Sequence, residues 1–445
     1  NNGLKYKLLL FWSNHFVIEA VNLHQYYASW LYYYVTHLHD NAFGNFLEMT
    51  KAIGLTPAML RYLNGNRSTK IAPNENYARE LLELFTMGPD NYSQTDVEEI
   101  ARIFTGWRAE GIPWGDNQNS GFPDNPNPWF PNEINAHLFR ETDHDWEEKV
   151  VFGKSHTPDE ETKNAAFQEY LWLHHEVIFK EKKDEVANFI CSKLYRFFVY
   201  DDVINETVVA ELATTFKDND WQIAPVLRQL FKSEHFFDEK IIGSGIKSPV
   251  DFLCGFLRQA NFKVDEDYFR EGPPTNSFFT YQFHTIRNYD FLALGQRVFS
   301  PVNVAGWPGG KTWITENTLT ARWSALTTKL KAFAWQQSGQ PTFPDTFEKF
   351  RQLAKDLTQE YSSDADFNNP EVIVTAIAEH FIITDLSPET VAAAVEKFKD
   401  EIPDFYYDND NWNLDTDYSF PNESVPRQVI NLLIYLTELP EYQLN

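Results

Sequence analysis

Cysteine is scarce in this sequence, which has only Cys191 and Cys254 among 445 residues. Two thiols are too few for the disulfide framework of a small secreted domain or for a thiolate zinc site, although one bridge stays open. A chain of this length does not need such cross-links, because it buries roughly three quarters of its unfolded surface. The cysteine content therefore does not decide the redox compartment.

Long apolar runs are also missing. None approaches the roughly 18 residues that a transmembrane helix needs, so we expect no transmembrane segment. The first residues, NNGLKYKLLLFW, lack the basic, apolar and small-residue pattern of a secretory signal and start almost inside a helical pattern. We interpret the chain as mature or truncated.

Cationic residues are in the minority, with 38 Lys and Arg against 64 Asp and Glu and a formal net charge of −26. Proteins bind nucleic acid through Lys and Arg side chains that release counterions from the phosphates. A strongly acidic surface repels phosphate backbones and anionic lipid surfaces alike. The charge excludes nucleic acid as an expected partner.

Strand candidates are rare, so the alternation of strands and helices that a parallel sheet needs is absent. Helical periodicity covers residues 4–35 and 41–63 and dominates again from about residue 161. We predict a mainly α fold, a multi-helix globular domain.

Residues 108–165 interrupt the helical pattern. They include GIPWGDNQNSGFPDNPNPWFPNE, which is too rich in Gly, Pro and Asn for regular structure and predicts a long loop. INAHLFR and KVVFG then flank the polar ETDHDWEE, which predicts a small β-hairpin. The expected organisation is an N-terminal helical part (1–107), this insertion (108–165) and a C-terminal helical part (166–445), together forming one continuous globular unit.

A polar helix face is predicted in PNENYARELLELFTMG, residues 73–88. Its polar side chains fall within an arc of roughly 140° at 100° per residue, with Asn74 as N-cap and Gly88 as the stop. In the next segment, TDVEEIARIFTGW, Thr95 and Glu98 are expected to form a capping box. The simplest interpretation of the face is solvated surface, because exposed ion pairs at this spacing contribute only about 0.2 to 0.5 kcal/mol each.

Several motifs in order make the chain resemble the bacterial "domain of unknown function 1800" family. The motifs are FWSNHF (11–16), NENYARELLELFTMG (74–88), DVEEIARIFTGW (96–107), HDWEEKVVFG (144–153), KLYRFFV (193–199), KSPVDFL (247–253) and VAGWPGGKTW (304–313). The resemblance covers nearly the whole chain. It implies an exported, extracytoplasmic protein whose biochemical activity is unassigned.

The polar residues of these motifs give the candidate site. Because they come from separated segments, we expect the polar face of residues 74–83 to meet the His-Asp turn in space. Histidine beside a carboxylate, facing another carboxyl of raised pKa, suits general acid and base catalysis, and an arginine would hold an anionic group. The catalytic candidates are His144, Asp145, Glu75, Glu80 and Arg79, and the substrate-binding candidates are Asn74, Asn76, Trp107, Lys149 and Trp307.

A divalent metal is the one cofactor considered. Imidazole with carboxylates suits zinc or manganese, and carboxylates alone suit calcium. The candidate ligands are His144, Asp145, Glu75 and His15. A phosphate loop in AGWPGGKT is not expected, because no buried strand precedes it and Pro308 removes a backbone NH.

Two hypotheses follow. In the first, the protein is an exported or cell-envelope hydrolase or processing enzyme that acts on an envelope or extracellular polymer. In the second, it is a non-catalytic glycan-binding or scaffold protein of the envelope, partnered by a polysaccharide or an envelope protein, and the same residues form a buried polar network. A site would line a water-filled concavity, whereas a scaffold would bury these side chains fully paired.

Overall fold

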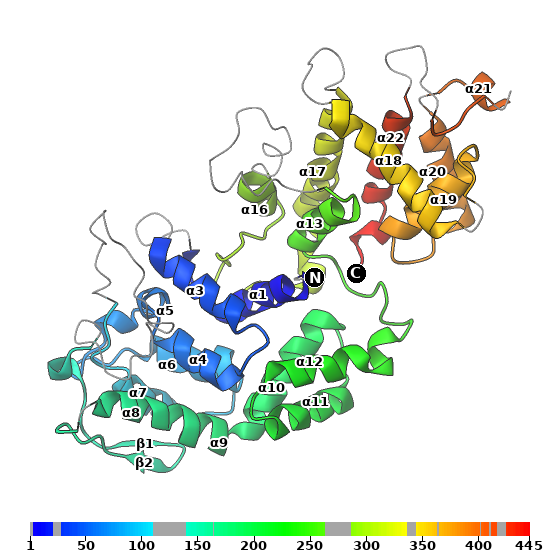
Figure 1. Ribbon diagram of the computed structural model, residues 1–445. Coiled ribbons are helices and arrows are strands. Elements are labelled where there is room, and N and C mark those ends of the chain that lie inside the picture. The colour runs from blue at the N-terminus through cyan, green and yellow to red at the C-terminus, as the bar shows by residue number, and fades with distance from the viewer. Residues whose placement is uncertain are drawn as a thin grey trace. The chain divides into compact units, whose positions relative to one another are not determined.

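The computed structural model describes residues 3–20, 28–109, 139–162, 164–262, 286–335, 344–362, 365–400, 402–408, 411–415 and 424–445. These residues are mainly α-helical, with one small antiparallel two-stranded sheet, which confirms the predicted fold class (Figure 1). Among them, no helix is both long and apolar enough to cross a membrane. The predicted loop lies almost entirely outside the described residues, since 110–138 fall between two described ranges.

The chain divides into two compact units. Unit 1 comprises Asn1–Phe236 and Val298–Pro308, and unit 2 comprises Phe237–Arg297 and Gly309–Asn445. The elements described in the first part of unit 1, where η denotes a 3₁₀ or π helix, are α1 (Gly3–His15), α3 (Ala28–Asp40), α4 (Phe46–Gly54), α5 (Pro57–Tyr62), η1 (Gly65–Arg67), α6 (Glu75–Glu80), η2 (Leu81–Thr86), α7 (Gln94–Ile103) and η3 (Glu141–Asp143). They continue with β1 (Lys149–Val151), β2 (Lys154–His156), α8 (Ala165–Trp172), η4 (Leu173–Ile178), α9 (Phe179–Glu181), α10 (Lys183–Phe198), α11 (Glu206–Asp218), α12 (Ile223–Lys232) and η5 (Glu234–Phe237).

Aromatic side chains form the core of unit 1. Trp12 of α1 and Phe16, the residue that directly follows this helix, contact Phe46 of α4 with ring centroids 5.6 and 6.1 Å apart, and Phe85 of η2 lies 5.4 Å from Phe16. All four rings are fully buried, and large aromatics remove the most apolar area from water per residue. This cluster fixes α1, α4 and η2 against one another.

The helix that carries the polar face begins as predicted and ends differently. Asn74 is its N-cap and accepts a hydrogen bond from the Asn76 backbone NH at 3.0 Å. After Glu80 the backbone widens into the π helix η2, and Gly88 follows with a φ of +83°. The predicted stop is therefore reached through a π turn, a rare form that leaves carbonyl groups available to other partners.

The predicted capping box of the next helix is wrong in position. Ser93 is the N-cap of α7, and its hydroxyl accepts from the Asp96 NH at 3.2 Å while the Asp96 carboxylate accepts from the Ser93 NH at 2.9 Å. The box thus starts two residues before Thr95. Ser93 precedes Thr95 in the sequence, and its hydroxyl can already accept a hydrogen bond from a backbone NH in the first turn, so the helix begins after Ser93.

The hairpin lies within the predicted insertion but uses another pairing. β1 comes from the expected KVVFG, and it pairs with Lys154–His156 instead of INAHLFR. Phe152 and Gly153 make the turn with φ of +48° and +74°, the left-handed pair that a two-residue hairpin requires. Of INAHLFR, residues 134–138 lie outside the described residues, and Phe139 forms a bridge with Trp107.

Unit 2 is a helical bundle around α17, α18 and α22, which pack against one another and against α19 and α20 (Figure 1). Buried Leu and Ile side chains of α19 and α22 form its core. The described elements are α13 (Pro249–Gln259), η6 (Ile286–Asp290), α16 (Phe291–Ala293), η7 (Gly310–Trp313), α17 (Glu316–Trp335), α18 (Pro344–Tyr361), α19 (Pro370–Phe381), α20 (Pro388–Lys399), α21 (Asp404–Asp408), α22 (Val425–Glu438) and η8 (Glu441–Gln443).

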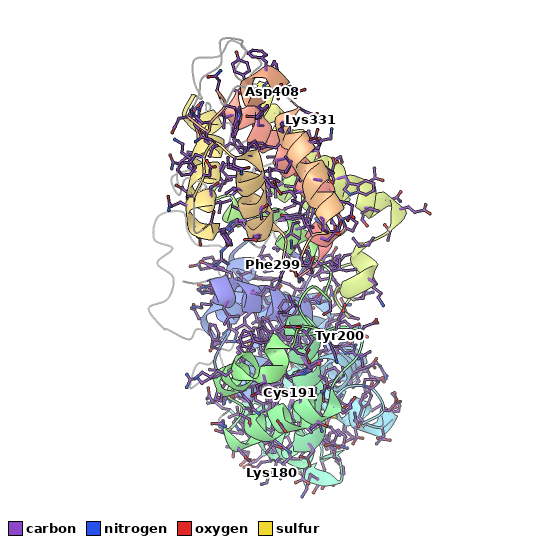
Figure 2. The ribbon with its side chains drawn as sticks, turned by 90° about the vertical axis from the view of Figure 1, so that its right-hand side faces the viewer. Lys180, Cys191, Tyr200, Phe299, Lys331 and Asp408 are labelled. Atoms are coloured by element: carbon purple, nitrogen blue, oxygen red, sulfur yellow. The ribbon has the colours of Figure 1, made fainter. Side chains whose placement is uncertain are left out.

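Both cysteines are free thiols, so the bridge left open by the sequence is not formed. Cys191 is buried on α10 of unit 1, where Figure 2 labels it, and Cys254 lies on α13 of unit 2. Burial raises the pKa of Cys254 to about 11 and that of Cys191 further still, because a thiolate is disfavoured away from water.

Candidate functional site

Arg102, near the end of α7, binds the predicted His-Asp turn. Its Nε lies 2.8 Å from Asp145 Oδ2 and its Nη2 lies 3.2 Å from Oδ1, a two-pronged pair. Its Nη1 also donates to Glu99 and to the carbonyl of Glu148. Burial is the largest single influence and opposes ionisation of Asp145. The hydrogen bonds from Arg102 and the Glu147 NH, together with the charges of Arg102 and Lys149, outweigh it and lower the pKa of this carboxyl overall.

Carboxylates on the same face of α7 hold the hairpin by its backbone. Glu99 Oε2 accepts the Val150 NH at 2.9 Å, and Asp96 Oδ1 accepts the Phe152 NH at 2.8 Å. Charge-assisted bonds of this kind are roughly twice as strong as neutral ones. The polar side of α7 therefore serves as a docking edge for β1.

Behind this edge lies a buried cluster of three charged or titratable side chains, His144, Lys149 and Glu169. All three are 0% exposed. Lys149 Nζ lies 3.0 Å from Glu169 Oε1, and His144 Nε2 lies 3.3 Å from Oε2. The Lys149 amine also donates to the Asp145 carbonyl. Two of these residues were predicted from motifs, and the structure brings them together on Glu169 of α8.

The orientation of His144 is fixed from its other side. Its Nδ1 is 2.8 Å from the Thr105 carbonyl oxygen, which can only accept, so Nδ1 carries a proton. Nε2 is thereby directed to Glu169. The rings of Trp146 and Phe139 pack at 4.5 and 5.2 Å from the imidazole and exclude water on that side.

Glu169 was missed from the sequence. It lies in AAFQEYLW between Ala166 and Leu173, which are both buried, at the helical spacing of an apolar stripe. A carboxylate within such a stripe is rarely buried without a partner, and this was the one signal that could have identified it.

The polar face of α6 forms a separate surface cluster of Glu75, Arg79, Gln94 and Glu98. Arg79 donates to Glu75 and to Gln94, both at 2.9 Å, and the amide of Gln94 donates to Glu75 and to Glu98, both at 3.0 Å. The Arg79 and Glu75 side chains are 40% and 39% exposed. Asn76 is exposed beside them.

These two clusters lie at different ends of α7. The surface cluster pairs with Gln94, the first residue of α7, whereas His144 pairs with Thr105, two residues past the last residue of this helix, which is roughly 15 Å long. The expected meeting of the polar face with the His-Asp turn is therefore not what the contacts describe. Residues of the separate sequence motifs each bind α7, at different positions along it, and do not meet in one site.

Glu80 belongs to neither cluster. It is half-buried, and its pKa is raised by burial and then by the neighbouring Glu83. The phenol of Tyr62 has a raised pKa from burial and from the charges of Glu19 and Glu80. Glu80 thus lies in a locally anionic environment, the condition that keeps a carboxyl protonated to higher pH.

His15 is a buried core histidine. Its Nε2 lies 3.0 Å from the Phe85 carbonyl, a bond that requires the proton on Nε2. Its Nδ1 accepts from Lys193 Nζ at 3.2 Å, and the same amine donates to the Leu84 carbonyl at 3.0 Å. These carbonyls belong to the π helix η2. Burial and Lys193 lower the pKa of His15 well below its usual value, and burial lowers that of Lys193 to about 8.

The two tryptophan candidates are core residues. Trp107 is 5% exposed and its ring lies 5.0 Å from that of Phe139. Trp307 is 6% exposed, and Asn14 binds its backbone twice, accepting the NH at 2.7 Å and donating to the carbonyl at 3.1 Å. A Cβ at Gly306 would lie 2.4 Å from Asn14 Oδ1, so only glycine fits there.

The described residues contain no preformed metal-binding site. They contain no cluster of three or more His, Cys, Asp or Glu side chains that could hold an ion. The candidate ligands His144, Asp145, Glu75 and His15 are each engaged with other protein groups, and they lie in three different neighbourhoods.

An open depression of about 660 Å³ lies between α11 and α12. Side chains of both charge signs line it, including Glu211, Arg228 and Lys232. It is formed by elements other than those that carry the buried cluster.

Comparison with protein families gives a match over residues 1–444 to the family described as "Protein of unknown function (DUF1800)". No curated protein and no solved structure matches the chain.

Proposed function

The chain belongs to the DUF1800 family, and from that premise we propose that it is a non-catalytic binding or scaffold protein of the cell envelope. One observation carries the proposal: His144, Lys149 and Glu169 are fully buried and directed at one another. A general acid or base has to lie within about 3 Å of the substrate proton that it moves. Side chains with no exposed surface do not meet that condition.

In a scaffold, these buried residues would fix residues 139–156 to the helices α7 and α8. Residues 139–156 are held by Arg102 and Glu99 of α7 on one side and by Glu169 of α8 on the other. Removing one member of a buried ion pair leaves an uncompensated charge and costs about 3 to 5 kcal/mol. Such a network supports a rigid surface that a polymer or an envelope protein could bind.

The test compares two carboxylate variants in stability and in binding. Glu169→Ala should lower the melting temperature by about 10 °C, because it strands Lys149 and His144, whereas the matched Glu75→Ala in the surface cluster should change it by about 1 °C. Purified wild-type chain should co-sediment with insoluble envelope polysaccharide and release no soluble fragments.

Release of fragments that disappears in a stably folded His144→Ala variant would contradict the proposal. Absence of sedimentation with every polymer tried would remove glycan binding and leave an envelope protein as the partner.

A hydrolase remains the second candidate, because Glu80 is half-buried with a raised pKa. A carboxyl of this kind suits a general acid that protonates a leaving group. In that case Glu80→Gln should reduce the rate of fragment release about 100-fold or more, while the melting temperature stays within about 1 °C of wild type. Glu98→Gln is the matched control, since Glu98 belongs to the surface cluster, where it accepts from Gln94. Equal release by wild type and Glu80→Gln would exclude this candidate.

A further inference from the structure

The amine of Lys149 and the carboxyl of Glu169 are in direct contact. Nζ lies 3.0 Å from Oε1, within hydrogen-bonding distance. The amine also donates to the Asp145 carbonyl. It is therefore held beside the carboxyl by a third group, with both partners 0% exposed.

We propose that Lys149 and Glu169 join covalently, through an amide bond between Nζ and the side-chain carboxyl carbon, in a reaction that the folded chain performs on itself. A proton first passes from the ammonium to the carboxylate. The free amine then attacks the carboxyl carbon, a C–N bond forms, one C–O bond breaks, and the oxygen leaves with two protons as water. The reaction needs no oxidant, reductant or other co-reactant.

Burial supplies the first requirement, a neutral amine. The pKa of Lys149 is lowered, chiefly because its ammonium is removed from water, although Glu169 opposes this shift. Desolvation disfavours the charged ammonium, so it favours the neutral amine that the attack requires. A lysine activated in this way is a nucleophile.

Position supplies the second requirement. Groups held in contact in a fixed geometry react as if at very high concentration, and Nζ lies 3.0 Å from Oε1, which is bonded to the carbon that the amine attacks. Lys149 belongs to β1, which Glu99 holds by its backbone, and Glu169 belongs to α8. Both groups are therefore fixed before reaction.

His144 supplies proton transfer. Its Nδ1 donates to the Thr105 carbonyl, so the neutral ring presents an unprotonated Nε2 to Glu169 Oε2 at 3.3 Å. That nitrogen first takes up the proton that the attacking amine loses and then delivers it to the leaving oxygen. Trp146 and Phe139 pack on the imidazole and limit the return of water, which would reverse the reaction.

The test is the mass of the wild-type chain measured under denaturing conditions. The expected mass is about 18 Da, one water, below that of the sequence, and proteolysis should yield a branched peptide that links Lys149 to Glu169. Lys149→Arg and Glu169→Ala should each have full mass, and Lys154→Arg, in the exposed strand β2, should keep the loss. His144→Ala should reach the lower mass at least about 10-fold more slowly.

Full mass of the wild-type chain, after purification and prolonged incubation of the folded protein, would overturn the proposal whether or not any variant folds. Loss of water that persists in Lys149→Arg would also overturn it. The mass does not depend on the envelope role proposed above, so the two proposals fail separately.

Discussion

At the scale of single residues, His15, His37 and His174 share a property with a measurable consequence. Burial is the largest cause of a lowered pKa in each, to about 4 for His37 and about 3 for His174. In the unfolded chain they titrate near 6.5. Below that pH the unfolded state binds protons that the folded state does not, so each histidine removes stability as the pH falls.

We therefore expect the free energy of unfolding to decrease below about pH 6.5, by up to about 1.4 kcal/mol per pH unit for each of these histidines, until the folded-state pKa is reached. His174→Gln should reduce this slope between pH 6 and pH 4 by about one such share. Denaturant unfolding at several pH values measures it. Identical slopes in wild type and His174→Gln would contradict the assignment of acid sensitivity to this residue.

At the scale of elements, α7 connects the parts of the candidate site. Its first turn carries Gln94 of the surface cluster, its middle carries Glu99 of the docking edge, and Arg102 near its end binds Asp145. The hairpin has only three residues in each strand, too few to be stable alone. Its stability should therefore depend on α7.

Arg102→Ala tests that dependence. It leaves Asp145 and Glu99 without their cation and should cost about 1 to 3 kcal/mol. Amide hydrogen exchange at Val150 and Phe152 should become at least about 10-fold faster, because both amides donate to carboxylates on α7. Arg79→Ala removes a comparable guanidinium from the surface cluster and should leave these amides protected. Unchanged exchange in Arg102→Ala would show that the hairpin holds without this pair.

At the scale of the whole molecule, local pattern predicts more than long-range contact does. Helical periodicity gave the fold class, and residues such as Asn74 carry their capping chemistry in their own side chains. Hairpin pairing was less predictable, because INAHLFR and Lys154–His156 lie on either side of β1 and pattern alone does not choose between them.

The candidate site was harder to predict, because the partners of its residues come from helices that are distant in the sequence. Lys149 and His144 were identifiable from their motif, but their partner Glu169 comes from α8. Likewise His15 was identifiable, whereas Lys193 completes its environment from α10. Each missing residue is charged and on a largely apolar helix face, where burial can be recognised only once the packing partner is known.

The division of the chain into units has a consequence for its synthesis. Val298–Pro308 belongs to unit 1 but follows Phe237–Arg297 in the sequence, and it supplies Trp307 to Asn14. A ribosome adds roughly 5 to 20 residues per second, so unit 1 waits several seconds for its last segment while the first part of unit 2 emerges. During that interval Asn14 has no Trp307 backbone to bind. The N-terminal unit therefore cannot finish folding first, as consecutive domains usually do, and translation has to pass residue 308 before it closes.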